Sequence, residues 1–227
     1  MKEQQKKLQQ TSDFYTPNGI HVYFKDAIDN EEVDVEMCVS RLEKVVPSHL
    51  LSEIEMIIIG WFDEFEERDI NAFYKDGALH ISHVQDDSED LFDDILHETA
   101  HSLETPYGQI IYSDEEMKNE FLRKRKHLYD ILWAKGFKAP LSFFMDTEYN
   151  KEFDMFLYEK IGYDKLSSLM AGLFINPYAA TSLSEYFATG FTEFYLNSDH
   201  KFLKTVSPGL YGKLFLLQNE EKLDELY

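Results

Sequence analysis

The first half of the chain alternates short apolar runs with polar turns, a pattern typical of β-strands separated by loops. Three runs predict strands, at residues 20–24, 54–62 and 78–84. The Asp76-Gly77 pair before the third run is a turn signal. Helical spacing over residues 33–46, stopped by Pro47, predicts a helix between the first two strands.

The second half of the chain shows the three-to-four-residue spacing of apolar positions that is typical of helices. Residues 114–135 fit one such helix, which we expect to end at Gly136. Further helices are predicted at residues 151–160, 164–171, 183–196 and 210–217. Because the strands gather in the first half and the helices in the second, the sequence predicts an α+β fold.

Length and composition limit the domain organisation. A chain of 227 residues with 44% hydrophobic side chains can bury one core, arranged at most as two lobes. Residues 1–17 are polar and rich in Lys and Gln, so we expect a frayed or loosely docked tail. Residues 18–227 are predicted to form a single domain, with a strand-containing N-terminal lobe at about 18–105 and a mostly helical C-terminal lobe at about 106–227.

The helix predicted after the third strand carries the clearest chemical pattern. Acidic residues at 86–90 supply an N-cap and favourable first-turn charges. A buried face is predicted from Leu91, Phe92, Ile95, Leu96 and Leu103. The sequence His-Glu-Thr-Ala-His at residues 97–101 then places two imidazoles one turn apart on one face, where they can share a zinc ion. Glu98 would reach the metal-bound water, as in the HExxH motif of zinc peptidases; the competing interpretation is a chance pattern at exposed positions.

Cysteine content and charge narrow the kinds of site and partner. Cys38 is the only cysteine, so neither an intramolecular disulfide nor a cysteine-based zinc site can form. The net charge of −21, from 43 acidic and 22 basic side chains, repels nucleic acid and anionic membranes and favours basic or neutral partners. The apolar run at residues 56–59 is too short to span a membrane, and the polar start leads into no signal segment. We therefore expect no nucleic-acid partner and no membrane span.

A catalytic zinc site needs a third protein ligand, because such sites normally have three and leave one position open. The extended HExxHxxGxxH pattern would require a histidine where this chain has Tyr107. The remaining common solution is a glutamate on a later helix, and Glu185 in the helix predicted at 183–196 is the candidate. A capping box with Ser182 is the competing role for Glu185, and Glu193 is the fallback ligand.

Two segments of the chain resemble one family of zinc metallopeptidases. Residues 185–191, Glu-Tyr-Phe-Ala-Thr-Gly-Phe, are similar to the glutamate helix of the anthrax lethal factor catalytic domain and of the secreted Pro-Pro endopeptidases, which are gluzincin-type zincins. The motif at residues 97–101 is the second segment, and a weaker similarity continues through 197–200. The resemblance implies a zincin-like metallopeptidase fold with the HExxH helix between the two lobes.

The same resemblance implies the composition of the site. One Zn²⁺ per chain would be held by His97, His101 and Glu185. Tyr178, seven residues before Glu185, stands at the position of the family's catalytic tyrosine and would donate a hydrogen bond to the oxyanion of the intermediate. Glu98 would accept the proton of the zinc-bound water and later pass it to the leaving amine.

The implied function is a zinc-dependent endopeptidase that acts on a peptide or protein substrate, with basic or proline-containing sequences as candidates. Two positions depart from the family: Ala100 stands where glycine is usual, and Thr189 stands where an acidic residue is usual. The Thr189 departure keeps an alternative open, a catalytically degenerate zincin that acts as a peptide- or protein-binding module. The relatives are secreted, whereas this chain begins without an export signal.

Other polar residues have ordinary interpretations. His80 and His83 fall on the third predicted strand and are not assigned to zinc, although the edge of that strand would pair with an extended substrate in a zincin. The basic run at residues 123–126 is expected to form a solvated face of its helix. His200 has no role that its spacing can support.

Overall fold

The computed structural model describes residues 12–68 and 70–224. It is an α+β structure, about 58% helical with a five-stranded mixed sheet, so the predicted fold class is confirmed. The chain divides into two compact units, Met1–Pro106 and Tyr107–Tyr227. Residues 1–11 of the expected tail lie outside the described residues, and Phe14–Tyr15 in the rest of it form a short strand.

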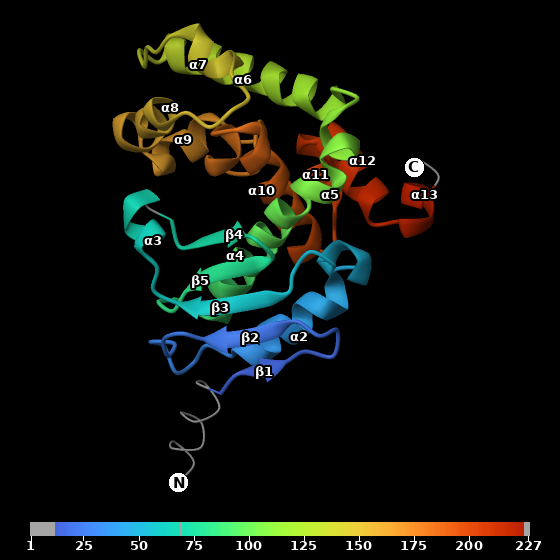
Figure 1. The fold of residues 1–227 in the computed structure, drawn as a ribbon. Helices are drawn as coiled ribbons and strands as arrows, with labels where there is room; N and C mark the ends of the chain where they lie inside the picture. The colour runs from blue at the N-terminus through green and yellow to red at the C-terminus, as the bar shows by residue number, and fades with distance from the viewer. Residues whose placement is uncertain (1–11, 69, 225–227) are drawn as a thin grey trace. The chain divides into compact units, whose positions relative to one another are not determined.

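The first unit is built on a sheet with the strand order β1-β2-β3-β5-β4 (Figure 1). The inner strands β2, β3 and β5 run parallel, and β1 and β4 pair antiparallel at the two edges. The strands are β1 (Phe14–Tyr15), β2 (His21–Phe24), β3 (Met56–Gly60), β4 (Ala72–Lys75) and β5 (Ala78–Ser82). The three predicted strands are therefore confirmed as the inner strands, and the prediction missed the two edge strands.

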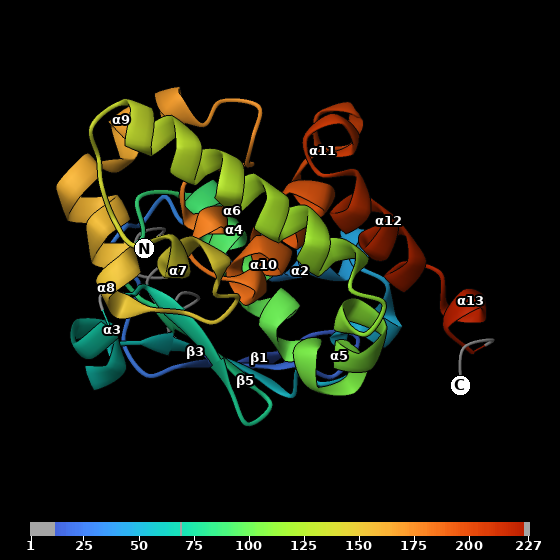
Figure 2. The same ribbon diagram turned by 90° about the horizontal axis from the view of Figure 1, so that it is seen from above.

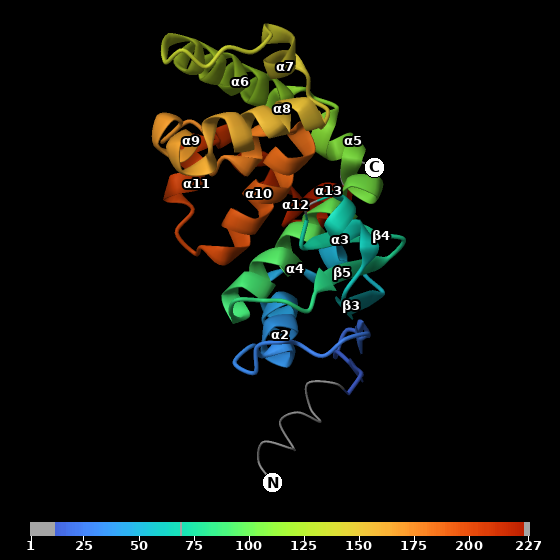
Figure 3. The ribbon, with the colours of Figure 1, turned by 90° about the vertical axis from the view of Figure 1, so that its left-hand side faces the viewer.

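Helices of the first unit cover the sheet and connect its strands. The helices are α2 (Val35–Val45), η1 (Ser48–Leu51), α3 (Asp63–Arg68) and α4 (Ser88–Ser102), followed by α5 (Glu104–Tyr112), which crosses into the second unit. Figure 3 shows α2 and α4 side by side on one face of the sheet. Cross-strand neighbours such as Val22, Ile57 and Leu79 are fully buried and line up across the inner strands, so the parallel register forms one continuous apolar layer.

A tight turn at Asp76-Gly77 joins β4 to β5. Both residues have positive φ, 48° and 81°, and an Asp-Gly pair adopts this left-handed backbone at little cost. The turn predicted at Asp76-Gly77 is therefore confirmed, whereas strand β4 before it was not predicted. Because β4 covers one side of β5, the strand at 78–82 is not an edge, and the expectation of a free edge there is wrong.

The second unit is helical. Its helices are α6 (Glu116–Ala134), α7 (Leu141–Met145), α8 (Lys151–Met155), η2 (Phe156–Ile161), α9 (Tyr163–Leu169), η3 (Tyr178–Ala180), α10 (Leu183–Leu196), α11 (Lys201–Val206), α12 (Pro208–Leu217) and α13 (Glu220–Asp224). Figure 2 shows the long helix α6 running across α10, and α6, α10 and α12 all contact one another. Among the described residues, no helix combines the length and the apolar character that a membrane crossing requires.

The basic run at residues 123–126 was predicted to form a solvated face, and the structure contradicts that prediction. Lys124 and Arg125 are only 8% and 1% exposed, so this part of α6 is not a solvated face. Lys124 Nζ donates hydrogen bonds of 2.7 Å to the hydroxyls of Tyr186 and Ser207, and Tyr186 donates to the carboxylate of Glu120. Burial lowers the pKa of Lys124 to about 8, while the Glu120 charge opposes that shift. These bonds connect α6 to α10 and to the residue that precedes α12.

Candidate metal centre

Helix α4 carries the HExxH residues, and its N-terminus and its apolar side are both fixed by local contacts. At its N-terminus the Asp87 carboxylate accepts hydrogen bonds from the backbone N–H groups of Glu89 and Asp90, at 2.8 and 2.9 Å. Its apolar side contacts β4 and β5 and includes the fully buried residues Leu91, Phe92, Ile95 and Leu96. The helix prediction and its buried face are therefore confirmed, and the face next to it carries the polar motif.

His97, Glu98 and His101 form one cluster on this helix. One potential ligand atom from each residue lies within 4.8 Å of the other two, and this is the one such group of His, Cys, Asp and Glu among the side chains that the structure describes. The two imidazole centroids are 5.1 Å apart with planes at 69°. The histidines are half-buried and Glu98 is 6% exposed, so a carboxylate is held beside two imidazoles with little access to water.

A second carboxylate contacts one of the two histidines directly. Glu104 lies in the first turn of α5, and its Oε1 is 2.9 Å from Nδ1 of His101. A histidine that binds a metal through one ring nitrogen commonly donates the other N–H to a carboxylate, which fixes the orientation of the ring. The contact is therefore of the kind found around metal-binding histidines, and sequence analysis did not identify it.

Asp93 and Asp94 lie on α4 near the cluster, and their surroundings raise the pKa of both carboxyl groups. Burial raises the pKa of Asp94 to about 7, against a hydrogen bond of 3.1 Å from the Gln85 amide, and the charges of Asp90, Asp93 and Glu98 raise it further. Burial likewise raises the pKa of Asp93, while the nearby His97 opposes the shift. Burial therefore favours the protonated form of both carboxyl groups.

The predicted third ligand and the predicted catalytic tyrosine belong to the second unit. Glu185 is half-buried in the first turn of α10, and its backbone N–H donates to Oγ of Ser182 at 3.1 Å, which is one of the two hydrogen bonds of the predicted capping box. Tyr178 is half-buried in η3, which contacts α10. Tyr178 and Glu185 therefore lie on neighbouring elements of one unit, and their convergence with the α4 cluster stays a prediction.

Arg125 holds the segment between Tyr178 and Glu185 and was missed by sequence analysis. Its Nη1 atom donates to the carbonyl oxygens of Ala180 and Thr181 at 2.7 and 3.1 Å, and its Nη2 atom donates to that of Phe143. The guanidinium also lies over the ring of Phe153, 4.1 Å from the centroid. A buried arginine thus fixes the backbone that carries the proposed catalytic tyrosine.

His80, His83 and His200 each contact a nearby aromatic, acidic or backbone group. His80 stacks on Phe73 at 4.4 Å, and burial lowers the pKa of its imidazole. His83 Nε2 lies 3.8 Å from a carboxylate oxygen of Asp29. His200 Nε2 lies 3.0 Å from the carbonyl oxygen of Phe194, at the end of α10. These contacts agree with leaving the three histidines out of the metal site.

Two positions on α10 bear on the predicted ligand. Thr189, the departure from the family pattern, is 5% exposed, and within the described residues its hydroxyl has no hydrogen-bond partner. Glu193, the fallback ligand, is half-buried two turns after Glu185.

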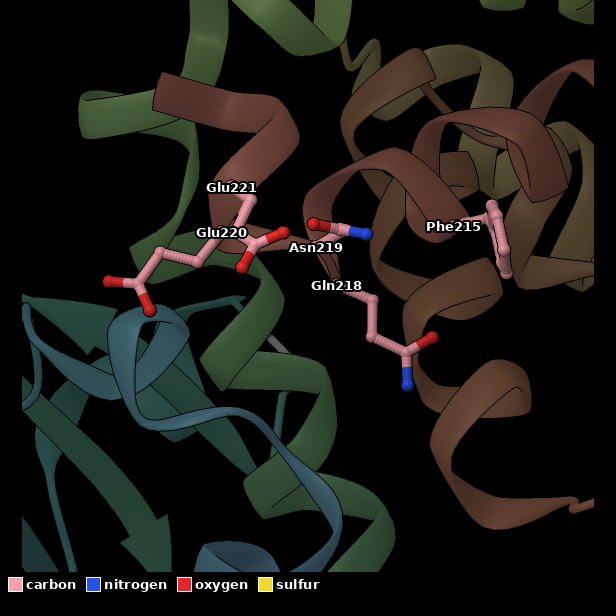
Figure 4. A pocket seen from close by; sticks show the side chains of 5 residues that line it. All are labelled: Phe215, Gln218, Asn219, Glu220 and Glu221. Carbon is pink, nitrogen blue, oxygen red and sulfur yellow. The ribbon is translucent and has the colours of Figure 1, made fainter. Parts of the chain in front are cut away.

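A shallow hollow lies between the end of α12 and the start of α13. It is lined by Phe215, Gln218, Asn219, Glu220 and Glu221. Figure 4 shows these side chains spread around the turn rather than directed at one centre. Four of the five are exposed and none is buried, so the hollow has none of the convergent, desolvated polar groups that a catalytic site requires.

Comparison of the chain with protein-family models, with curated proteins and with solved structures gave no match. The functional conclusion therefore depends on the α4 cluster, on the residues around it, and on the resemblance of the two short sequence segments. Of these, the cluster of His97, Glu98 and His101 has the most specific chemistry.

Proposed function

We propose that this protein is a zinc-dependent endopeptidase with a zincin-like fold. The observation that carries the proposal is the cluster on α4, where donor atoms of His97, Glu98 and His101 lie within 4.8 Å of one another. In the proposed site, His97 and His101 bind one zinc ion and Glu185 is the third protein ligand. Glu98 is the general base and Tyr178 the oxyanion donor.

The residues of the cluster fit a zinc ion. Two nitrogen atoms that bind one zinc at about 2.1 Å in tetrahedral geometry lie about 3.4 Å apart. Donor atoms already within 4.8 Å on one helix face can reach that separation by small side-chain rotations. With the single cysteine, Cys38, buried and its pKa raised by burial to about 11, imidazole and carboxylate groups are the available donors.

The proposed chemistry is hydrolysis of a peptide bond by a water molecule. Bound zinc would act as a Lewis acid and lower the pKa of the attacking water. Glu98 accepts the proton of that water and then transfers it to the nitrogen of the leaving amine. The position of Glu98 supports this role, because its carboxylate lies beside both imidazoles and has little access to bulk water. Tyr178 donates its hydroxyl proton in a hydrogen bond to the oxyanion of the tetrahedral intermediate.

The second unit supplies a rigid support for its two proposed residues. Arg125 binds the carbonyl groups of Ala180 and Thr181, and the N-cap Ser182 binds the backbone of Glu185. A transition-state donor and a metal ligand must be held to within a fraction of an ångström, and buried hydrogen bonds of this kind restrict the backbone that carries them. The environment of Tyr178 and Glu185 therefore supports a functional role for the segment 178–185.

The charge of the protein indicates a substrate class. A net charge of −21 would attract a basic peptide and raise its association rate at low ionic strength. We therefore propose a peptide or protein substrate with basic residues, and the family resemblance adds proline-containing sequences. Added salt should lower kcat/KM for basic peptides more than for neutral ones.

A peptide-library cleavage screen, with and without a chelator, tests the proposed activity. The purified protein should cleave a subset of peptides, and the chelator should abolish that cleavage. Glu98→Gln should keep the metal and lower kcat at least about 100-fold, whereas the control Glu89→Gln, an exposed change on the same helix, should leave kcat unchanged. Equal activity of Glu98→Gln and the wild-type protein would refute the general-base role. Peptide binding without cleavage would instead support a degenerate zincin that acts as a binding module.

A further inference from the structure

His101 and Glu104 are in direct hydrogen-bond contact, and this contact favours one tautomer of the imidazole. Nδ1 of His101 lies 2.9 Å from Oε1 of Glu104, and the two side chains are 20% and 28% exposed. An ionised carboxylate has no proton to donate, so the hydrogen bond requires the proton to be on Nδ1 of the imidazole. In the neutral ring the lone pair that can bind a metal is then on Nε2.

We propose that Glu104 is the positioning residue for His101 as a metal ligand. Glu104 holds the proton on Nδ1 and orients the ring so that Nε2 is the coordinating atom. Its negative charge also strengthens the attraction for a divalent cation. The inference rests on the zinc centre of the proposed function and adds to it the residue that orients one ligand.

The backbone between α4 and α5 holds the pair in place. Helix α4 ends at Ser102, and the fully buried Leu103 forms the junction, with its N–H bonded to the carbonyl oxygen of Ala100 at 3.1 Å. Glu104 then begins α5, where an acidic side chain is favoured by the helix dipole. Because the junction comes directly after the turn that carries His101, the carboxylate is three residues from the imidazole and on the same side.

Zinc affinity measured by competition with a chromophoric chelator tests the role of Glu104 in the intact chain. Glu104→Ala removes the acceptor and the charge, and it should raise the zinc Kd by about 10- to 100-fold. Glu104→Gln keeps an acceptor oxygen without the charge, so a smaller increase is expected. Glu36→Gln, the same charge change at an exposed position of α2, should leave the Kd within about twofold of wild type.

Nitrogen NMR of the metal-free protein labelled at histidine separates positioning from a structural role. In wild type and in Glu36→Gln, the His101 ring should be in the Nδ1–H form, and in Glu104→Ala the Nε2–H form should become populated. Loss of helix stability alone would not change this ratio. A zinc Kd within twofold of wild type in Glu104→Ala, with the tautomer of His101 unchanged, would overturn the inference.

The inference and the proposed function can fail separately. If His101→Ala loses zinc while Glu104→Ala keeps wild-type affinity, Glu104 is not a positioning residue and the zinc centre still holds. If the wild-type protein binds no zinc, or His101→Ala binds it as tightly as wild type, the proposed function is refuted and the inference with it. Glu104→Gln keeps the experiment decisive if Glu104→Ala does not fold.

Discussion

The Nη1 atom of Arg125 donates a hydrogen bond of 2.7 Å to the carbonyl oxygen of Ala180. The arginine is on α6, and the alanine ends the short helix η3 that begins with Tyr178. The guanidinium is 1% exposed and also binds the carbonyl oxygens of Thr181 and Phe143. One side chain therefore satisfies three carbonyl groups in the region that leads into α10.

Arg125→Met should destabilise the protein by about 3–5 kcal/mol, because removing the guanidinium leaves buried carbonyl groups without donors. Urea denaturation followed by circular dichroism measures the change. Arg123→Met makes the same replacement two residues earlier at an exposed position, and its free energy of unfolding should stay within about 0.5 kcal/mol of wild type. Equal stability of the two variants would show that Arg125 does not support η3.

Gly190 allows α10 to approach α12. A Cβ atom at this position would lie 2.8 Å from Cγ of Leu210, which is fully buried. Gly190→Ala should therefore destabilise the protein by roughly 1–3 kcal/mol, although alanine is the better helix former. In the background of Leu210→Ala the same change should be neutral or stabilising. Additive effects in this double-mutant cycle would contradict the close contact.

Asp94 should make stability depend on pH in the metal-free protein. Burial raises the pKa of its carboxyl to about 7, so between pH 4 and 7 the folded state binds a proton that the unfolded state has released. This contribution is present below pH 4 and is lost as the pH rises to 7. Asp94→Asn lacks it and should be more stable than wild type at pH 8, by about 1–2 kcal/mol after solvent screening. Unfolding measured in a chelator at pH 4 and pH 8 should show the difference only at pH 8.

The elements that were predicted from the sequence are those determined by residues close together in the chain, such as N-caps and the helical spacing of apolar residues. Helix α4 was predicted because Asp87 caps it and its apolar residues repeat at helical spacing. Helix α10 was predicted with the bounds that it has in the structure, since Ser182 is an N-cap and apolar side chains fill the segment. The HExxH cluster was also predictable, because four-residue spacing on a helix places His97 and His101 on one face regardless of what surrounds it.

Features that depend on distant packing were not predicted. Strand β4 has only four residues, a run too short to show the alternation that predicts a strand, and it pairs with β5 in the sheet. The burial of Lys124 and Arg125 depends on partners such as Tyr186 and Ala180, which are more than 50 residues away in the chain. Glu104 was missed because an acidic side chain at a helix start has an ordinary explanation, and its contact with His101 depends on the backbone at the junction between α4 and α5.

The most direct test of the zinc centre is equilibrium dialysis of the full chain against zinc, with bound metal measured by elemental analysis. We expect one zinc per wild-type chain, loss of that site in His97→Ala and His101→Ala, and at least about tenfold weaker binding in Glu185→Gln. A wild-type protein that retains no zinc, or histidine variants that bind it as tightly as wild type, would contradict the account.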